Sequence, residues 1–369
     1  MWPEGGKPVG LVDLFCGCGG MSLGVSEAVR RAGRRVEHVL ACDLSDSQLA
    51  VYRSNFGDEA VRKEDLSGLS SLLGSSMTPV ELKLFRPIVE RNVDFLLAGP
   101  PCQGHSNLNN HTRRSDPKNE LYFKVARAAE LIAPRHILIE NVPGVIRDHG
   151  AAVERTELSL RELGYRVHHE VLDLTRIGVA QTRKRHVMVA TKVEVDESAL
   201  KFANLLAPYF VPKRSLAWAI SDLTDVEEPG LMGQVPVMAP QTLERVNYLF
   251  DNDLYDLPDE QRPDCHREKA HTYQSVYGRM KWDNPSPTLT SGFMTVGRGR
   301  FLHPSERRTL TPREAARVQF FPDYFSFVAL DNKKAIADAI GNAVPPKMSM
   351  VFASALLGFD GSNVKPTSY

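Results

Sequence analysis

The sequence has no run of about eighteen consecutive apolar residues, which excludes a conventional transmembrane helix. It begins with MWPEGGKPVG, which lacks the charged and then apolar pattern of a secretory signal peptide. The five cysteines are odd in number and scattered, so they do not predict a disulfide framework. We therefore expect a protein of the reducing cytoplasm with no membrane partner.

A net charge is also lacking, because 45 basic residues are balanced by 45 acidic ones. This excludes a DNA-coating protein held by charge alone, but not a DNA-binding enzyme, for which local charge matters more. Residues 297–319 are locally basic and contain only two acids, Glu306 and Glu314. The arginines there are Arg298, Arg300, Arg307, Arg308, Arg313 and Arg317. This stretch is either a solvated surface or a phosphate-binding face.

Repeats and low-complexity segments are absent too, and the first half of the chain alternates apolar runs with helical patterns. Strands are expected at 9–16, 36–43, 93–100, 136–142, 166–174 and 185–191, with helices at 21–33, 47–56 and 121–134. Such alternation is typical of an α/β fold with a doubly wound, mostly parallel sheet.

After about residue 195 the alternation stops, and prolines, acids and short apolar pieces mix. We expect a main domain over 1–195, completed by the C-terminal 331–369, and a smaller irregular domain over 196–330. The segment PDCHREKAH offers cysteine and histidine, but an adjacent Cys-His pair does not fit the usual zinc spacing. Cys16 and Cys18 lack a second ligand pair, so we predict no metal.

The first strand ends in DLFCGCGG, a glycine corner that lets a ligand approach the backbone before a helix. It does not fit the dinucleotide pattern GxGxxG. Asp43 ends the second strand, where a carboxylate can accept hydrogen bonds from ribose hydroxyls, and Asp65 lies where it could receive an adenine amino group. These acids either bind an adenosine cofactor or are solvent-facing loop residues.

A lone cysteine follows two prolines in GPPCQGHS, residues 99–106. Cys102 is either a nucleophile presented on a rigid turn or a small residue at a strand end. Glu140 ends a further apolar strand, which would place it at the same sheet edge.

Six motifs in order carry a resemblance: DLFCGCGGMSLG, GPPCQGHS, ENVPGV, QTRKR, LTPREAARVQFFPD and IGNAVPP. Together they resemble the C5-cytosine DNA methyltransferases, over roughly residues 9–190 and 285–350. The resemblance implies a Rossmann-like methyltransferase sheet with a smaller target-recognition domain, whose variable part is about 196–284. It also implies S-adenosylmethionine as methyl donor, with S-adenosylhomocysteine as product.

The chemistry explains the catalytic residue types. A thiolate adding to C6 of cytosine makes C5 nucleophilic, and the resemblance gives this role to Cys102. Glu140, protonated or sharing a proton, would bond N3 and the 4-amino group. Arg183 and Arg185 alternate in QTRKR, so strand geometry predicts one shared face, with Lys184 opposite. The resemblance implies that both arginines steer the C2 carbonyl, the neighbouring phosphate and the cysteine loop, and we interpret Asn141 as structural.

For the cofactor, the resemblance implies that Phe15 stacks on adenine, that Leu44 and Leu66 sandwich it, and that Asp65 binds its amino group. Asp43 takes the ribose position, where the family usually has Glu. The remaining expected contacts are Asp13, Gly17, Gly19, Gly20, Pro101, Leu121 and Asn342.

Double-stranded DNA is the expected partner, and the target cytosine must be flipped out of the duplex. The polar residues after Cys102 are predicted to close over the DNA, and His105 stands where the family usually has Phe. Expected DNA contacts are Gln103, Ser106, Arg113, Arg114, Arg298 and Arg300. We expect a bacterial, nucleoid-associated monomer with a cognate restriction endonuclease or defence-system partner. Two alternatives stay open, an RNA substrate and a relative that binds DNA without catalysis, although the long middle region and the intact motifs argue against them.

Overall fold

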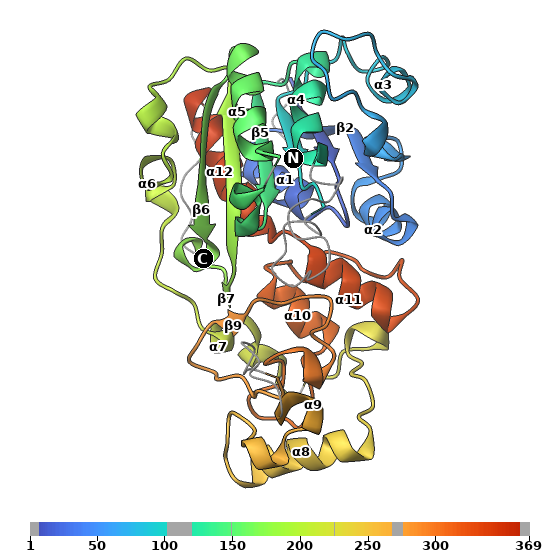
Figure 1. Cartoon of the computed structure of the whole chain (residues 1–369), viewed down its shortest axis with the longest axis vertical. Helices are drawn as coiled ribbons and strands as arrows, with labels where there is room; N and C mark the ends of the chain where they lie inside the picture. The colour runs from blue at the N-terminus through green and yellow to red at the C-terminus, as the bar shows by residue number, and fades with distance from the viewer. Residues whose placement is uncertain (1–6, 102–119, 149, 225, 268–275, 362–369) are drawn as a thin grey trace. The chain divides into compact units, whose positions relative to one another are not determined.

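Seven strands form one sheet in the order β3-β2-β1-β4-β5-β8-β6 (Figure 1). They are β1 Val9–Leu14, β2 Val36–Asp43, β3 Val61–Lys63, β4 Phe95–Ala98, β5 His136–Asn141, β6 Arg166–Asp173 and β8 Lys184–Thr191. The computed structural model describes residues 7–101, 120–148, 150–224, 226–267 and 276–361, without the side chains of 265 and 266. In that part of the chain all expected strands form, and β3 is an addition.

The first five strands are parallel, and β8 runs antiparallel to both β5 and β6. A parallel pair needs a long crossover, usually a helix, whereas the connection from β6 to β8 contains no α-helix. The expectation of a mostly parallel, doubly wound sheet is therefore confirmed, with β8 as its antiparallel strand.

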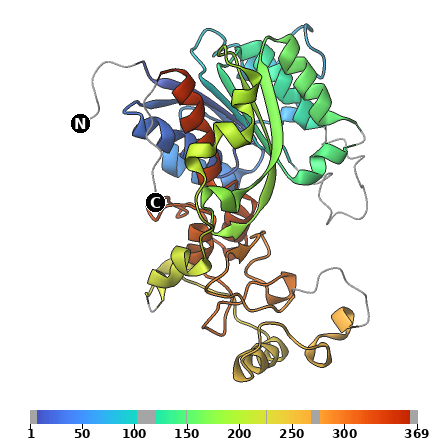
Figure 2. The same cartoon turned by 90° about the vertical axis from the view of Figure 1, so that its left-hand side faces the viewer.

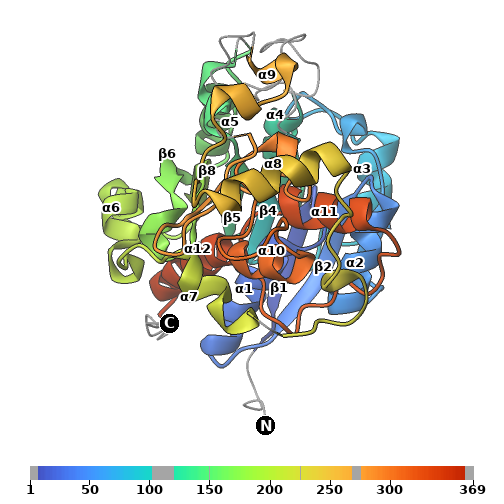
Figure 3. The ribbon, with the colours of Figure 1, turned by 90° about the horizontal axis from the view of Figure 1, so that it is seen from below.

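Helices cover both faces of the sheet, as Figure 3 shows, with α4 and α5 on one side and α1 and α12 on the other. The helices are α1 Gly20–Arg31, α2 Asp46–Phe56, α3 Pro79–Leu84, α4 Glu120–Ile132, α5 Ala152–Glu162, α6 Phe202–Leu205 and α12 Pro346–Phe359. The largest core cluster joins inward-facing residues of the central strands to α4 and α5, for example Leu96, Ile139 and Val125. Gly33, with φ of 71°, follows α1 as expected of a helix stop.

A second compact unit comprises Gly178–Arg183 and Pro212–Ala343. Long loops and short elements dominate it (Figure 2). They are the strand pair β7 Gln181–Thr182 and β9 Ser286–Pro287, and the helices α7 Leu216–Ile220, α8 Pro240–Asp251, α9 Asp264–Arg267, α10 Pro312–Val318 and α11 Lys333–Asn342. It has its own apolar cluster around Val246, Leu249, Val276 and Leu302.

The first unit comprises Met1–Ile177, Lys184–Val211 and Val344–Tyr369. Its bounds differ from the expected 1–195 and 331–369, since 196–211 packs with the sheet and 178–183 and 331–343 belong to the second unit. The reason is that β7, within 178–183, forms hydrogen bonds with β9, and that α11, within 331–343, packs against α10. Among the described helices, none is both long and apolar enough to span a membrane.

Candidate active site

Three segments meet at the carboxyl edge of the parallel strands. The glycine turn follows β1, the Gly99–Pro101 turn follows β4, and Val142 follows β5. Because β1, β4 and β5 are adjacent and parallel, these three ends lie at one edge of the sheet, where open α/β sheets bind ligands.

The glycine turn has an unusual backbone. Phe15 has φ of 60°, a left-handed conformation that is uncommon for a non-glycine residue, and Gly17 and Gly19 have φ of 53° and 95°. A Cβ on Gly19 would meet the Phe56 ring at 2.5 Å. Backbone conformations of this kind cluster at ligand sites, and helix α1 begins directly afterwards, so its N–H groups point toward the edge.

Asp43 joins two loops at this edge. Its Oδ2 accepts a hydrogen bond from the Gly17 N–H and its Oδ1 accepts one from the Ser45 N–H, each at 2.9 Å. The shorter side chain at the predicted ribose position is thus held against the glycine turn. Each carboxylate oxygen has a second lone pair, so the predicted ribose contact is compatible with this arrangement.

Asp13 is the first member of a hydrogen-bond chain that was not predicted from the sequence. The Ser22 hydroxyl donates to Asp13 Oδ2 at 2.6 Å and lies 2.9 Å from the Tyr52 hydroxyl, which lies 2.9 Å from His38 Nδ1. Burial, with a smaller contribution from the nearby Asp43, outweighs the hydrogen bonds from Ser22 and raises the pKa of Asp13 to about 7. Asp13 is thus tied to Ser22 of α1, the helix that follows the glycine turn, and its predicted contact with the cofactor stays a prediction.

The predicted adenine residues are unequally placed. Leu44 is 62% exposed, whereas Leu66 is 3% exposed within the main core, with Phe15 packed against that core. Asp65 is exposed and accepts a hydrogen bond from the Ser67 N–H at 2.9 Å, and this bond lowers its pKa. Leu121 is buried on α4. Their adenine and methyl-donor roles stay predictions.

A buried ion pair joins the end of β5 to the start of β8. Arg185 Nε lies 2.6 Å from Glu140 Oε1, and the two side chains are 12% and 9% exposed. Asn141 donates from Nδ2 to the Pro100 carbonyl at 3.2 Å and accepts from the Val142 N–H at 2.8 Å. The structural interpretation of Asn141 is confirmed, and its bond to Pro100 fixes the turn that leads to the cysteine.

Six of the predicted positions in the following segment lie outside the described residues: Cys102, Gln103, His105, Ser106, Arg113 and Arg114. The predicted closing segment lies outside them as well.

With this geometry in place, the family can be established. The model of the C-5 cytosine-specific DNA methylases matches residues 9–357. The chain belongs to this family. Its enzyme class is DNA (cytosine-5)-methyltransferase.

Curated relatives agree. The methylase is 44% identical over 348 residues to the type II methyltransferase M1.BsuMI of Bacillus subtilis, covering 94% of this chain and 80% of the relative. It is 31% identical over 355 residues to M1.HphI of Haemophilus parahaemolyticus, covering 94% and 86%.

Solved structures show the same fold at lower identity. A DNA modification methyltransferase encoded within a prophage of E. coli has a TM-score of 0.64 at 22% identity, covering 96% of this chain and 99% of that one. The S. pombe Dnmt2 methyltransferase has a TM-score of 0.61 at 18% identity, covering 95% and 98%. The expected Rossmann-like methyltransferase fold is thus confirmed.

The predicted shared face of Arg183 and Arg185 stays a prediction, because the two arginines of the methylase do not lie in one strand. Strand β8 begins at Lys184, and Arg183 precedes it in the second unit. Its guanidinium is buried and donates to the carbonyls of Leu289 at 2.9 Å and Ala343 at 3.2 Å. Alternation holds only within one regular strand, whereas here the chain passes from one sheet to another.

The methylase pairs most arginines of its basic stretch with acids inside the second unit. The pairs are Arg300 with Asp256, Arg307 with Asp251, Arg308 with Glu306 and Glu314, Arg313 with Glu228, and Arg317 with Asp222 and Asp323. Arg298 is exposed and has no ion pair with a described residue. Of the two arginines predicted to contact DNA here, Arg298 is therefore the available cation, while Arg300 is held by Asp256. Asn342, predicted to contact the cofactor, is exposed at the end of α11.

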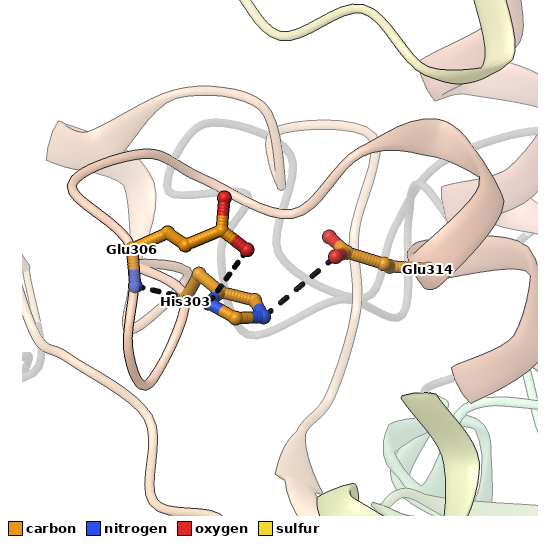
Figure 4. A group of neighbouring side chains, drawn as sticks. All are labelled: His303, Glu306 and Glu314. Carbon is orange, nitrogen blue, oxygen red and sulfur yellow. Dashed lines mark hydrogen bonds and ion pairs between the residues drawn. The ribbon is translucent and has the colours of Figure 1, made fainter. Parts of the chain in front are cut away.

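One group of the methylase has the residue types of a metal site, His303 with Glu306 and Glu314 (Figure 4). However, Arg308 donates four hydrogen bonds of 2.7 Å to the two carboxylates. His303 Nδ1 accepts from the N–H groups of Ser305 and Glu306, so a neutral ring carries its proton on Nε2, 3.7 Å from Glu314. No ring lone pair is available for a metal, and we assign the group a structural role.

Proposed function

We propose that the chain transfers the methyl group of S-adenosylmethionine to C5 of cytosine, at a specific sequence in double-stranded DNA. The observation that carries this proposal is the single sheet edge that combines the glycine turn after β1, the Pro-Pro turn after β4 and the Glu140–Arg185 pair at β5 and β8. One substrate site and one cofactor site can therefore be adjacent.

The residues of the glycine turn fit an adenosine-bearing cofactor. The left-handed Phe15 and Gly17, where an added Cβ would have only Gln48 Oε1 nearby at 3.9 Å, leave a backbone that a ligand can approach, and Asp43 lies beside it as an acceptor for hydroxyls. When bound, S-adenosylmethionine supplies an electrophilic methyl group on a sulfonium. No group of phosphate-binding glycines in the GxGxxG pattern is present, in keeping with a cofactor that lacks phosphates.

The chemistry assigned to this chain's residues is covalent. The Cys102 thiolate forms a bond to C6, which makes C5 nucleophilic toward the methyl group. Loss of the C5 proton and cleavage of the sulfur–C6 bond then restore the aromatic ring. Glu140 would bond N3 and the 4-amino group as charge develops, with Arg185 fixing the carboxyl from β8. Asn141 supports the thiol indirectly, through the Pro100 carbonyl.

The cytosine must leave the duplex to meet this edge, so the proposal includes base flipping. By similarity to relatives named type II methyltransferases, we further propose a role beside a cognate restriction endonuclease. A monomeric state and a cytoplasmic, nucleoid-associated location stay predictions.

The test combines transfer and mapping. Purified protein and its Cys102→Ser variant are incubated with S-adenosyl-L-[methyl-³H]methionine and either plasmid DNA or bulk tRNA, and DNA from expressing cells is sequenced after bisulfite treatment. We expect label in DNA, one methylated cytosine context, and loss of both in the variant. Label in tRNA alone would replace this proposal with the RNA alternative, and no label with either substrate would favour a non-catalytic relative.

A further inference from the structure

A buried lysine of α4 holds the turn that follows Asp65. Lys124 Nζ donates to the carbonyl of Leu69 at 2.7 Å and also to the carbonyl of Ser67. The side chain is 8% exposed and forms no ion pair with a described residue, and burial lowers its pKa. Glu120, Asp65 and Glu81 act on this charge only from a distance, so the two carbonyls are its direct hydrogen-bond partners and offset much of the cost of burying it.

One turn further along α4, Arg127 extends the same attachment. Its guanidinium bonds Glu81 at 3.0 and 3.1 Å and the Ser75 carbonyl at 2.8 Å. Glu81 also accepts from the N–H groups of Ser70 and Thr78, each at 2.8 Å. Burial alone would raise the pKa of Glu81, but these donors together lower it. Segment 66–81 is therefore fixed to α4 by a polar network whose centre, Glu81 with Arg127, is buried, while Ser70, Ser75 and Thr78 at its edge are partly exposed.

This network adjoins the predicted adenine residues. The 3-10 turn η1, Leu66–Gly68, begins at Asp65, whose carboxylate caps it through the Ser67 N–H. Lys124 holds the Ser67 carbonyl of that same turn. Leu121, predicted to contact the methyl-donor end, is three residues before Lys124 and so lies on the same face of α4. Helix α4 thus carries one predicted cofactor residue, Leu121, and holds the turn that carries two more, Asp65 and Leu66.

We propose that Lys124 is a positioning residue for the adenosine end of the cofactor, acting through the Ser67 and Leu69 carbonyls on Asp65 and Leu66. This inference rests on the proposed function, because it takes S-adenosylmethionine as the ligand. It assigns Lys124 no contact with DNA or with the reacting atoms. Loss of its charged donors therefore weakens cofactor binding and leaves the chemical step alone.

The experiment uses Lys124→Met, which keeps the aliphatic stem, Lys124→Arg, which keeps charged donors, and Lys124→Gln as a second, milder loss. Lys201→Met, at an exposed lysine preceding α6, is the matched control. Binding of S-adenosylhomocysteine is measured by calorimetry without DNA. Methyl transfer then gives KM for S-adenosylmethionine, KM for DNA and kcat, and thermal unfolding monitors the fold.

We expect the Kd for S-adenosylhomocysteine and the KM for S-adenosylmethionine to rise roughly tenfold to a hundredfold in Lys124→Met, in line with the loss of hydrogen bonds from a charged donor. The same two constants should be intermediate in Lys124→Gln, and in Lys124→Arg they should lie within about threefold of the wild type. In all three variants, kcat and the KM for DNA should stay within about twofold of the wild type. Lys201→Met should match the wild type. If Lys124→Met does not fold, the Gln and Arg variants carry the comparison.

The outcomes separate the two proposals. If the wild type binds S-adenosylhomocysteine but Lys124→Met and Lys124→Gln bind it equally well, the positioning role is wrong and the proposed function stands. If kcat, DNA affinity and thermal stability fell together with cofactor affinity, the positioning role would also be wrong, because Lys124 would then support the fold as a whole. If the wild type binds neither compound, the proposed function fails and this inference fails with it.

Discussion

Replacement of Glu140 by Gln tests the charge at the end of β5 without changing its shape. The amide keeps an acceptor for Arg185, whose Nε lies 2.6 Å from Glu140 Oε1, but it carries no charge and cannot share a proton with a base. Because both side chains are about nine-tenths buried, solvent screens the pair little.

The expected loss is mainly catalytic. Proton transfer by a positioned side chain contributes roughly 10²–10⁴-fold, so kcat should fall by that factor, which corresponds to about 3–5 kcal/mol of barrier. Removing one partner of a buried ion pair also costs stability, up to roughly 3 kcal/mol here because the amide still accepts a hydrogen bond.

The assay is methyl transfer from labelled S-adenosylmethionine at saturating DNA, with urea unfolding in parallel. Glu194→Gln is the matched control, since Glu194 forms a similar ion pair with Arg166 at an exposed position. If Glu140→Gln retains kcat within tenfold of the wild type while folding normally, the role of the carboxyl in the reaction is refuted. An equal loss in Glu194→Gln would point to the fold instead.

Three further outcomes are expected. Asn141→Ala frees the Pro100 carbonyl and should lower kcat about tenfold or more with little change in cofactor Kd, whereas an equal change in both would contradict the assigned role. Burial and the neighbouring His169 lower the pKa of His186 to about 3, below its unfolded value of about 6.5. The unfolded chain therefore gains the proton first, and His186 should lower stability by up to about 1.4 kcal/mol per pH unit as pH drops from 6.5 to about 3. In urea unfolding, His186→Asn should lose this contribution, while His38, whose burial lowers its pKa to about 4, keeps its own. In DNA-binding titrations against salt, Arg298→Met should reduce the slope of log K by about one and Arg300→Met should not, and equal slopes would refute the assignment.

The sheet and the glycine turn could be predicted because their signals are local. Buried parallel strands are near-continuous apolar runs, and the residues just after them, such as Asp43 and Glu140, lie at one edge by geometry alone. Helix α8 has a local signal as well, since Pro240 stands at its first turn, but the surrounding irregular composition concealed it.

What the sequence could not predict depends on long-range partners. Arg183 looked like a strand residue, but the pairing of β7 with β9 across more than a hundred residues removes it from β8. Nothing local indicates that Lys124 bonds carbonyls 55 and 57 residues earlier. Ser22 and Tyr52 likewise lie within ordinary helix patterns, and only the fold brings them to Asp13.

The internal ion pairs of the second unit have a kinetic consequence for how DNA is searched. Arginines that are neutralised by Asp222, Asp251, Asp256 and Asp323 should release few counterions from a duplex, so we expect this part of the second unit to hold random sequence weakly. Short encounters with non-target DNA favour frequent dissociation and rebinding over long one-dimensional sliding. Under the proposed function, we expect the time spent at a site to be governed by the contacts that only the correct sequence and the extruded cytosine provide.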